Sequence, residues 1–279
     1  MKAFEELGLS QKYLSSVEKM EYTEPTPIQI AAIPPLLEGR DLIGQAQTGT
    51  GKTAAFMLPL LQRLDNSVSG VKALILAPTR ELAKQVTDAG KALAQKTNFK
   101  IISVYGGQSY SIQLRALERG VDVVVGTPGR LLDLIHQKHL DLSHVSMLII
   151  DEADEMLAMG FIEDVELILR ELSDQRQVAL FSATLPERIR KLSERYLNNP
   201  VKIAINPKAV TVAEIEQRCY RVREEAKIAA LTRLLEIEDV TSALIFTRTK
   251  ARAQDLSEDL LRMGFAADAL HGDLNQNRR

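Results

Sequence analysis

The sequence predicts an α/β protein in which a buried parallel sheet carries helices on both faces, followed by a linker and an incomplete second unit. Runs rich in Val, Ile and Leu alternate with amphipathic segments along most of the 279 residues, a pattern typical of strands joined by crossover helices. From Pro200 to Val212 the composition changes and no helical period is visible. We therefore expect one domain over 1–204, a linker over 205–213 and part of a second domain over 214–279.

Each element of the first unit is predicted from its own residues. Thr26 and Pro27 suit the cap and first turn of a helix that should end near Pro34-Pro35 or Gly39. Strands are expected at 41–44, 71–77 (apolar apart from Lys72), 101–105, 121–126, 145–150 and 177–181. Helices are expected at 54–64, 80–93, 108–118, 130–137, 162–172 and 187–197. Right-handed crossovers should connect the parallel strands.

The same alternation resumes after the linker. Strands are expected at 215–222, 243–246 and 266–270, and helices at 225–236 and 250–263. These roughly seventy residues are fewer than a complete domain of this kind usually needs, so we expect the second unit to be partial.

The overall composition excludes several classes of protein. Hydrophobic residues make up 45% and charged residues 26%, which is ordinary for a globular protein. The net charge of −2 gives no bulk reason to bind nucleic acid or an anionic membrane, so any basic surface must be local. The single cysteine, Cys219, excludes a disulfide framework. Apolar runs such as 147–150 are too short to span a bilayer, and the first ten residues lack a signal-peptide pattern. We expect a cytoplasmic protein.

A phosphate-binding loop is the strongest local motif. Ala46-Gln47-Thr48-Gly49-Thr50-Gly51-Lys52-Thr53 lies between the first strand and the next helix, which is the context of a nucleotide-phosphate cradle. Gly49 and Gly51 allow the backbone to turn its N–H groups inward around an anion. Lys52 should reach the β- and γ-phosphates and Thr53 should bind Mg²⁺. The first position is alanine, where the general pattern requires glycine.

An acidic motif follows another expected strand. Asp151-Glu152-Ala153-Asp154 comes directly after 145–150, and ligands of an open parallel sheet bind at the carboxyl ends of its strands. Asp151 is therefore a candidate Mg²⁺ ligand, and Glu152 a candidate base or water-positioning residue. The alternative is a solvated acidic helix cap, which the presence of Lys52-Thr53 disfavours.

Together these motifs resemble those of the bacterial-type DEAD-box ATP-dependent RNA helicases. The family's phosphate loop, A-x-T-G-x-G-K-T, matches 46–53 in full, including the initial alanine. Phe4 and the segment from Tyr22 through Thr26 to Gln29 resemble the family's Q motif within 1–40. There Gln29 would hydrogen-bond the adenine edge while an aromatic packs on the base. Glu21 stands where the family usually has glycine.

The resemblance implies a RecA-like fold and assigns further residues. Ser182-Ala183-Thr184 resembles the motif that couples hydrolysis to strand separation, so Ser182 and Thr184 join Lys52, Asp151 and Glu152 as expected catalytic residues. Other matching motifs imply RNA contacts at Pro78, Thr79, Arg80, Gly106, Gly107, Thr127, Arg130, Thr247, Gly272 and Gln276. Such groups bind phosphates and sugars rather than base edges, so we expect sequence-independent RNA binding.

The family's activity becomes the functional hypothesis. It implies an ATP-dependent RNA helicase that separates short duplexes when ATP and RNA drive closure of two domains. The family's last two motifs are missing after Arg279, so we expect a C-terminally truncated chain that binds ATP and RNA but hydrolyses weakly or not at all. Two alternatives stay open: a non-catalytic RNA clamp, and another ATP-driven nucleic-acid translocase.

Overall fold

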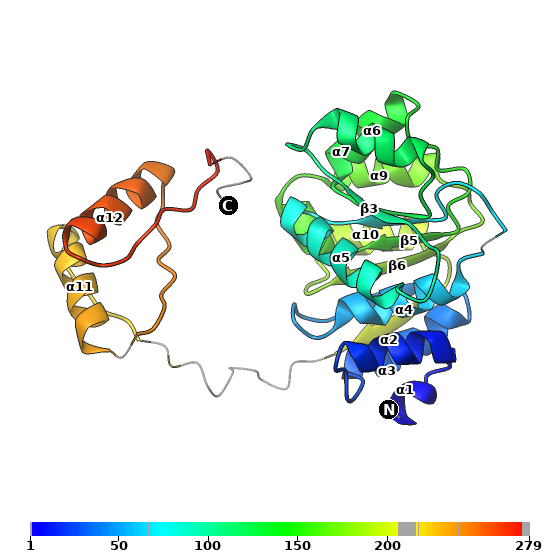
Figure 1. Ribbon diagram of the computed structural model, residues 1–279, viewed down its shortest axis with the longest axis horizontal. Coiled ribbons are helices and arrows are strands. Elements are labelled where there is room, and N and C mark those ends of the chain that lie inside the picture. The colour runs from blue at the N-terminus through cyan, green and yellow to red at the C-terminus, as the bar shows by residue number, and fades with distance from the viewer. Residues whose placement is uncertain (1, 66, 206–215, 217, 239, 275–279) are drawn as a thin grey trace. The chain divides into compact units, whose positions relative to one another are not determined.

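The chain forms two compact units, 1–209 and 210–279. The computed structural model describes residues 2–65, 67–205, 216, 218–238 and 240–274 (Figure 1). The expected linker, 205–213, lies outside the described residues apart from Ile205. Among the described residues, no helix has the length and apolar character that crossing a membrane requires.

The first unit is built on a seven-stranded parallel sheet in the order β3-β4-β2-β5-β6-β1-β7. The strands are β1 (Leu42–Gln45), β2 (Ala73–Leu76), β3 (Ile101–Val104), β4 (Val123–Gly126), β5 (Met147–Ile150), β6 (Gln177–Ser182) and β7 (Val201–Ala204). The first six confirm the predicted strands. The sequence pattern does not predict β7, because its residues alternate between half-buried and exposed at the sheet edge instead of forming a continuous apolar run.

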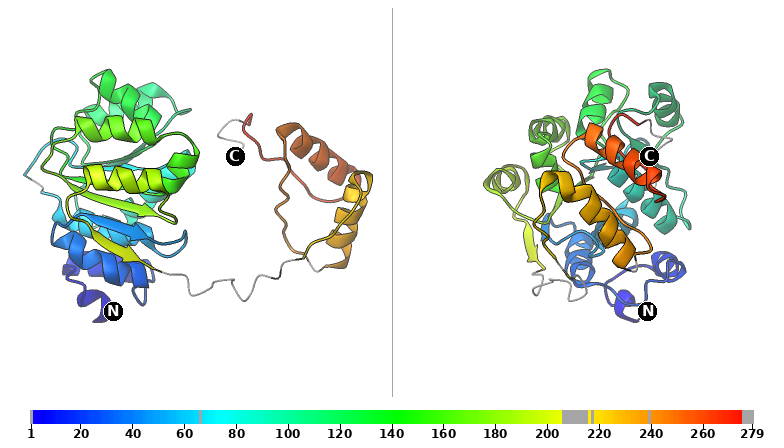
Figure 2. Two further views of the ribbon diagram at one scale, coloured as in Figure 1. Left: turned by 180° about the vertical axis from the view of Figure 1, so that it is seen from behind. Right: turned by 90° about the vertical axis from the view of Figure 1, so that its left-hand side faces the viewer.

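Helices cover both faces of this sheet, as predicted (Figures 1 and 2). Alternate strand residues point to opposite faces and enter two separate apolar clusters. One cluster contains residues of α1 (Lys2–Glu5), α2 (Gln11–Lys19), α3 (Pro27–Leu37), α4 (Lys52–Arg63) and α5 (Arg80–Leu93). The other involves α6 (Tyr110–Glu118), α7 (Pro128–His136), α8 (Ala153–Ala158), α9 (Ile162–Glu171) and α10 (Glu187–Tyr196).

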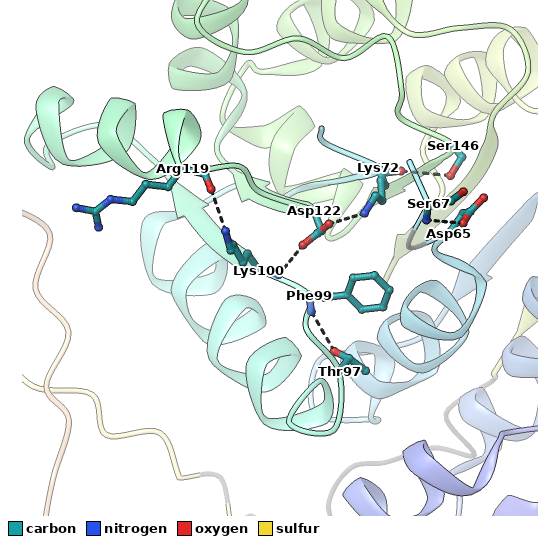
Figure 3. Close-up of polar contacts among 9 residues, drawn as sticks. All are labelled: Asp65, Ser67, Lys72, Thr97, Phe99, Lys100, Arg119, Asp122 and Ser146. Atoms are coloured by element: carbon teal, nitrogen blue, oxygen red, sulfur yellow. Dashed lines mark hydrogen bonds and ion pairs between the residues drawn. The ribbon is translucent and has the colours of Figure 1, made fainter. Parts of the chain in front are cut away.

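Polar contacts through Asp122 hold the amino ends of three neighbouring strands together (Figure 3). Lys72, just before β2, donates to Asp122, just before β4, at 2.5 Å. The other carboxylate oxygen of Asp122 accepts from the backbone N–H of Lys100, just before β3, at 2.7 Å. The Lys72 ammonium also lies 5.6 Å from the ring centre of Phe99. A single carboxylate therefore joins the starts of β2, β3 and β4.

The second unit is helical in the part that the structure describes. A 3₁₀ turn, η1 (Glu224–Ala226), leads into α11 (Lys227–Ile237), and α12 (Lys250–Arg262) follows. Both predicted helices are confirmed. The predicted strands at 243–246 and 266–270, and the described part of 215–222, are wrong. Leu244 and Phe246 are 87% and 92% exposed, and a strand exists only where a neighbouring segment completes its hydrogen-bond ladder.

Candidate nucleotide and RNA site

The phosphate loop leaves β1 at the carboxyl end of the sheet and enters α4. Gly49 and Gly51 both take positive φ angles, 79° and 89°, which a side chain would strain. Gly51 is constrained a second time, because an added Cβ would lie 2.6 Å from the amide nitrogen of Gln29. Thr48 and Thr50 lie on the loop and Thr53 is half-buried in the first turn of α4. The predicted loop and helix start are therefore both present.

Lys52 is buried without a partner. Its side chain follows the loop at the first position of α4 and is only 5% exposed. Its ammonium nitrogen has no hydrogen-bond acceptor among the residues that the structure describes, and the buried hydroxyl of Thr26 likewise has no partner there. An unpaired buried cation is costly, and an anion bound in the loop would remove that cost.

Two carboxylates follow β5 on the same edge of the sheet. Asp151 is buried, and burial raises its pKa to about 6, although the positive charge of Lys52 opposes the shift. Burial also raises the pKa of Glu152, again against Lys52. Because the charge of Lys52 acts on both carboxylates, the phosphate loop and the acidic motif form one electrostatic site. Glu152 itself takes a left-handed conformation, φ 52°, at the start of α8.

Asp154 ties the acidic motif to the end of β6, the strand between β5 and β1. One carboxylate oxygen accepts from the backbone N–H and the hydroxyl of Thr184 at 2.8 and 2.9 Å. The hydroxyl of Ser182 accepts from the backbone N–H of Asp154 at 3.1 Å and donates to the Thr184 carbonyl at 2.6 Å. Burial alone would raise the pKa of Asp154, but these hydrogen bonds outweigh it and lower the pKa.

The Q-motif segment contacts the phosphate loop through the side chain of Gln29. The side chain of Gln29 accepts from the Thr26 backbone N–H at 2.9 Å and donates to the Gly51 carbonyl at 3.1 Å. One amide N–H and one carbonyl lone pair of Gln29 therefore remain for a ligand. Tyr22 packs partly buried against the core. Phe4 is 1% exposed, so a base could stack on its ring only if the N-terminal segment moved, and that contact stays a prediction.

A group of predicted RNA-contact residues meets at the ends of β2 and β3. Thr79 caps α5 by accepting from the Leu82 backbone N–H at 3.1 Å, and Pro78 before it is buried. The guanidinium of Arg80 lies against Gly106-Gly107, because a Cβ on Gly107 would come within 2.1 Å of it. Gly107 also has a positive φ of 83°. Arg80 and the two glycines therefore form one surface.

The next group follows β4. Thr127 is buried at the start of α7, and its backbone N–H donates to the Val104 carbonyl at 3.0 Å. The Arg130 guanidinium donates to the side chain of Gln113 at 3.1 Å and lies 5.1 Å from the ring centre of Tyr110. Sequence reasoning did not identify Gln113 or Tyr110, because α6 carries no motif of its own.

The second unit holds the remaining predicted RNA residues. Thr247 is half-buried and its hydroxyl donates to the Thr249 carbonyl at 3.0 Å. Gly272 is exposed, and Gln276 lies outside the described residues. The structure brings Arg80 together with Gly106-Gly107, and the RNA contacts expected in both units stay predictions.

A phosphate loop before α4 and a buried aspartate after β5, both at the carboxyl edge of a parallel sheet, define a P-loop nucleotide-binding domain. The comparisons with known proteins narrow this class. The family model described as DEAD/DEAH box helicase matches residues 26–192, and this chain belongs to that family.

Relatives with known names cover the whole chain. The ATP-dependent RNA helicase CshA of Listeria monocytogenes is 48% identical over 279 residues, which are 100% of this chain and 54% of the relative. The RNA helicase CrhR of Synechocystis is 49% identical over 277 residues, 99% of this chain and 56% of the relative. The chain thus spans about half the length of the curated relatives it matches.

Solved structures share the fold. Yeast Dbp5 bound to RNA and ADP BeF3 has a TM-score of 0.86 at 32% identity, covering 100% of this chain and 71% of that one. A DEAD box protein from Methanococcus jannaschii has a TM-score of 0.71 at 41% identity, and the match covers 99% of this chain and 75% of that one. These matches agree with the predicted RecA-like architecture and with nucleotide use by the family.

Proposed function

We propose that this chain is the ATP- and RNA-binding part of an ATP-dependent RNA helicase. The observation that carries the proposal is the buried ammonium of Lys52, which has no partner among the described residues and sits between the phosphate loop and two carboxylates whose pKa values are raised. Triphosphate oxygens supply the negative charge that such a site requires. Relatives named as ATP-dependent RNA helicases support the choice of ATP.

The same residues fit Mg²⁺. Thr53 and Asp151 would hold the ion, since Mg²⁺ bound with a nucleotide usually takes only one or two protein oxygens besides phosphates and water. The ion would supply positive charge against the phosphates. Among the described residues no group of three or more His, Cys, Asp or Glu gathers as a metal cluster.

Glu152 would orient the attacking water and accept its proton. Its pKa is raised by burial, which brings a carboxylate closer to the value at which proton transfer near neutral pH is efficient. Lys52 would stabilise charge on the transferred phosphoryl group. The hydrogen bonds that join Asp154 to Ser182 and Thr184 would transmit changes at the acidic motif to the end of β6.

RNA would bind along the loops after β2, β3 and β4. Arg80, Arg130 and the backbone of Gly106-Gly107 offer guanidinium and amide donors, which suit phosphates and do not distinguish bases. Contacts to the 2′-hydroxyl would favour RNA over DNA. A structure of yeast Dbp5 bound to RNA, similar to this chain at a TM-score of 0.86, supports this choice of partner.

The experiment that tests the proposal is ATP hydrolysis by this chain with and without RNA, beside Glu152→Gln. RNA-stimulated turnover that Glu152→Gln abolishes would establish the enzyme. ATP and RNA binding without turnover would favour the non-catalytic RNA clamp. Equal binding of matched RNA and DNA oligonucleotides would instead favour a general nucleic-acid translocase. No binding of ATP by the unmodified chain would contradict the proposal outright.

A further inference from the structure

Gln113 is a buried polar residue that the proposed mechanism does not use. It lies on α6, is 2% exposed and makes three side-chain hydrogen bonds. Its amide nitrogen donates to the Tyr105 carbonyl and to the side-chain oxygen of Gln108, both at 2.9 Å. Its amide oxygen accepts from Arg130 at 3.1 Å. Its partners come from the loop after β3 and from the first turn of α7.

The orientation of the Gln113 amide is fixed by its surroundings. Reversing it would set the NH₂ group against the Arg130 cation and the oxygen against two acceptors, so only one orientation satisfies all three neighbours. Because a buried amide that loses its partners is costly, the network resists opening. Gln113 therefore acts as a rigid link rather than as an adaptable surface contact.

Apart from Gln113, the two segments are joined by the sheet and by a 3.5 Å contact from Arg130 to the Gln108 carbonyl. The ladder between β3 and β4 ends with the Thr127 N–H bonded to the Val104 carbonyl at 3.0 Å. Beyond that point no further ladder hydrogen bond joins the described residues of the loop 105–108, which contacts Arg80, to those of the turn that carries Arg130. Gln113 bonds to both, so it replaces the missing ladder where the proposed RNA surface begins.

Arg130 has a competing partner. Its guanidinium nitrogen Nε lies 3.9 Å from Asp133, an exposed carboxylate one turn along α7, whereas the hydrogen bond to Gln113 is 3.1 Å. Without Gln113 the remaining polar contacts are this long ion pair and a 3.5 Å contact to the Gln108 carbonyl. The guanidinium would then be held mainly by the ring of Tyr110, 5.1 Å away, and would turn more easily toward Asp133, which would weaken the charge that should meet RNA.

We propose that Gln113 is a positioning residue that holds Arg130 and the Gly106-Gly107 loop in one preformed surface for the RNA backbone. This inference rests on the proposed RNA binding and adds a residue outside the motifs that suggested it. Preforming the surface lowers the conformational cost of binding. Gln113 itself need not touch RNA, since its side chain is enclosed.

The test compares Gln113→Met with Gln62→Met. Gln62 is a matched control because its side chain also links two segments, accepting from Ser10 N–H at 2.7 Å and donating to the Gly8 carbonyl at 2.9 Å, with no bond to the loops of the proposed RNA surface. Both variants should lower the melting temperature. Only Gln113→Met should weaken binding of a fluorescent single-stranded RNA, by about tenfold, while both keep the affinity for a fluorescent nucleotide.

A double-mutant cycle separates positioning from general damage. If Gln113 acts through Arg130, the pair Gln113→Met/Arg130→Met should bind RNA about as well as Arg130→Met alone, so the two effects are not additive. Amide exchange at Gly106 and Gly107, measured without RNA, should speed up in Gln113→Met and stay unchanged in Gln62→Met. Strict additivity in the cycle, or unchanged exchange, would overturn the inference.

RNA binding by the unmodified chain and by Gln113→Met gives distinguishable outcomes. If the unmodified chain binds no RNA at all, the proposed function falls and the role of Gln113 in RNA binding falls with it. If the unmodified chain binds RNA and Gln113→Met binds it equally well, only the inference about Gln113 is overturned.

Discussion

Two buried lysines lie at opposite ends of the same sheet, and they differ in what surrounds their ammonium groups. Lys52 and Lys72 are each 5% exposed. Lys52 follows β1 at the carboxyl end and has no hydrogen-bond partner within the described part of the chain. Lys72 precedes β2 at the amino end, where Asp122 accepts from it at 2.5 Å and Phe99 lies below it (Figure 3).

Burial of a charge does not by itself indicate function. Lys72 is compensated within the fold, so it joins strands and gains nothing from a ligand. Lys52 has no hydrogen-bonded partner among the described residues, and only the through-space charge of Asp151 and Glu152 offsets the cost of its burial until an anion binds. A buried charge therefore indicates a binding site when its partner is missing, and a structural tie when its partner is present.

The largest effect is expected from removing the compensated lysine. Lys72→Met leaves Asp122 mostly buried without its cation, and breaking such a pair typically costs about 3 kcal/mol or more of the free energy of unfolding. Chemical unfolding of the first unit would measure this loss. Adding Asp122→Asn removes the uncompensated charge and keeps an acceptor for the Lys100 N–H, so the double variant should recover most of the stability. If Lys72→Met were as stable as the unmodified protein, the Lys72–Asp122 pair would not be a structural tie.

Removing Lys52 should instead change nucleotide affinity much more than stability. Lys52→Met removes a buried charge without breaking a hydrogen-bonded ion pair, although it also removes the attraction between Lys52 and the carboxylates of Asp151 and Glu152. The ligand-free protein should therefore lose much less stability than it does in Lys72→Met. Nucleotide affinity should fall by about 100-fold, because a charge-assisted contact to phosphate is lost. Titration with a fluorescent nucleotide, beside thermal unfolding without ligand, separates the two results. Equal nucleotide affinity in Lys52→Met would show that Lys52 does not face the phosphates.

The buried carboxylate of Asp151 should make the stability of the first unit depend on pH. Burial raises its pKa from 3.8 to about 6, so the folded protein disfavours the charged carboxylate. Its contribution to stability is full below about pH 4 and is lost as the pH rises through about 6, a change of about 3 kcal/mol. Asp151→Asn should therefore unfold at higher denaturant than the unmodified protein at pH 8, without nucleotide or Mg²⁺, and the gap should close toward pH 4. A gap that does not vary with pH would contradict the raised pKa.

Local patterns predicted what depends on neighbours in sequence. Six strands, the phosphate loop and the acidic motif follow from runs and spacings within about ten residues. Lys72 was visible only as one polar residue in an apolar run, and nothing in the sequence pairs it with Asp122, fifty residues later. The role of Gln113 was not predicted for the same reason, because its partners come from two segments that only the folded sheet brings together.

The second unit shows the opposite error. Apolar runs at 243–246 and 266–270 predicted strands, but an apolar run forms a strand only when another segment pairs with it and covers it. In the described residues these segments have no regular secondary structure, and Phe246 is 92% exposed. Helices α11 and α12 were predicted correctly because their hydrogen bonds lie within the segment itself. Strand prediction therefore fails first where no described segment pairs with the apolar run.

The smallest effect concerns Glu21, the position where the sequence departs from the family's usual glycine. Glu21 follows α2 with a positive φ of 58°, which explains the family's preference, because glycine adopts that angle without strain. Glu21→Gly should raise the free energy of unfolding by about 0.5–1 kcal/mol after its added flexibility in the unfolded chain is counted. Glu24, exposed in the same turn but without a positive φ, is the control, and Glu24→Gly should lose stability. Urea unfolding of both variants gives the size of a pure backbone effect, which should be several times smaller than the effect of leaving Asp122 unpaired.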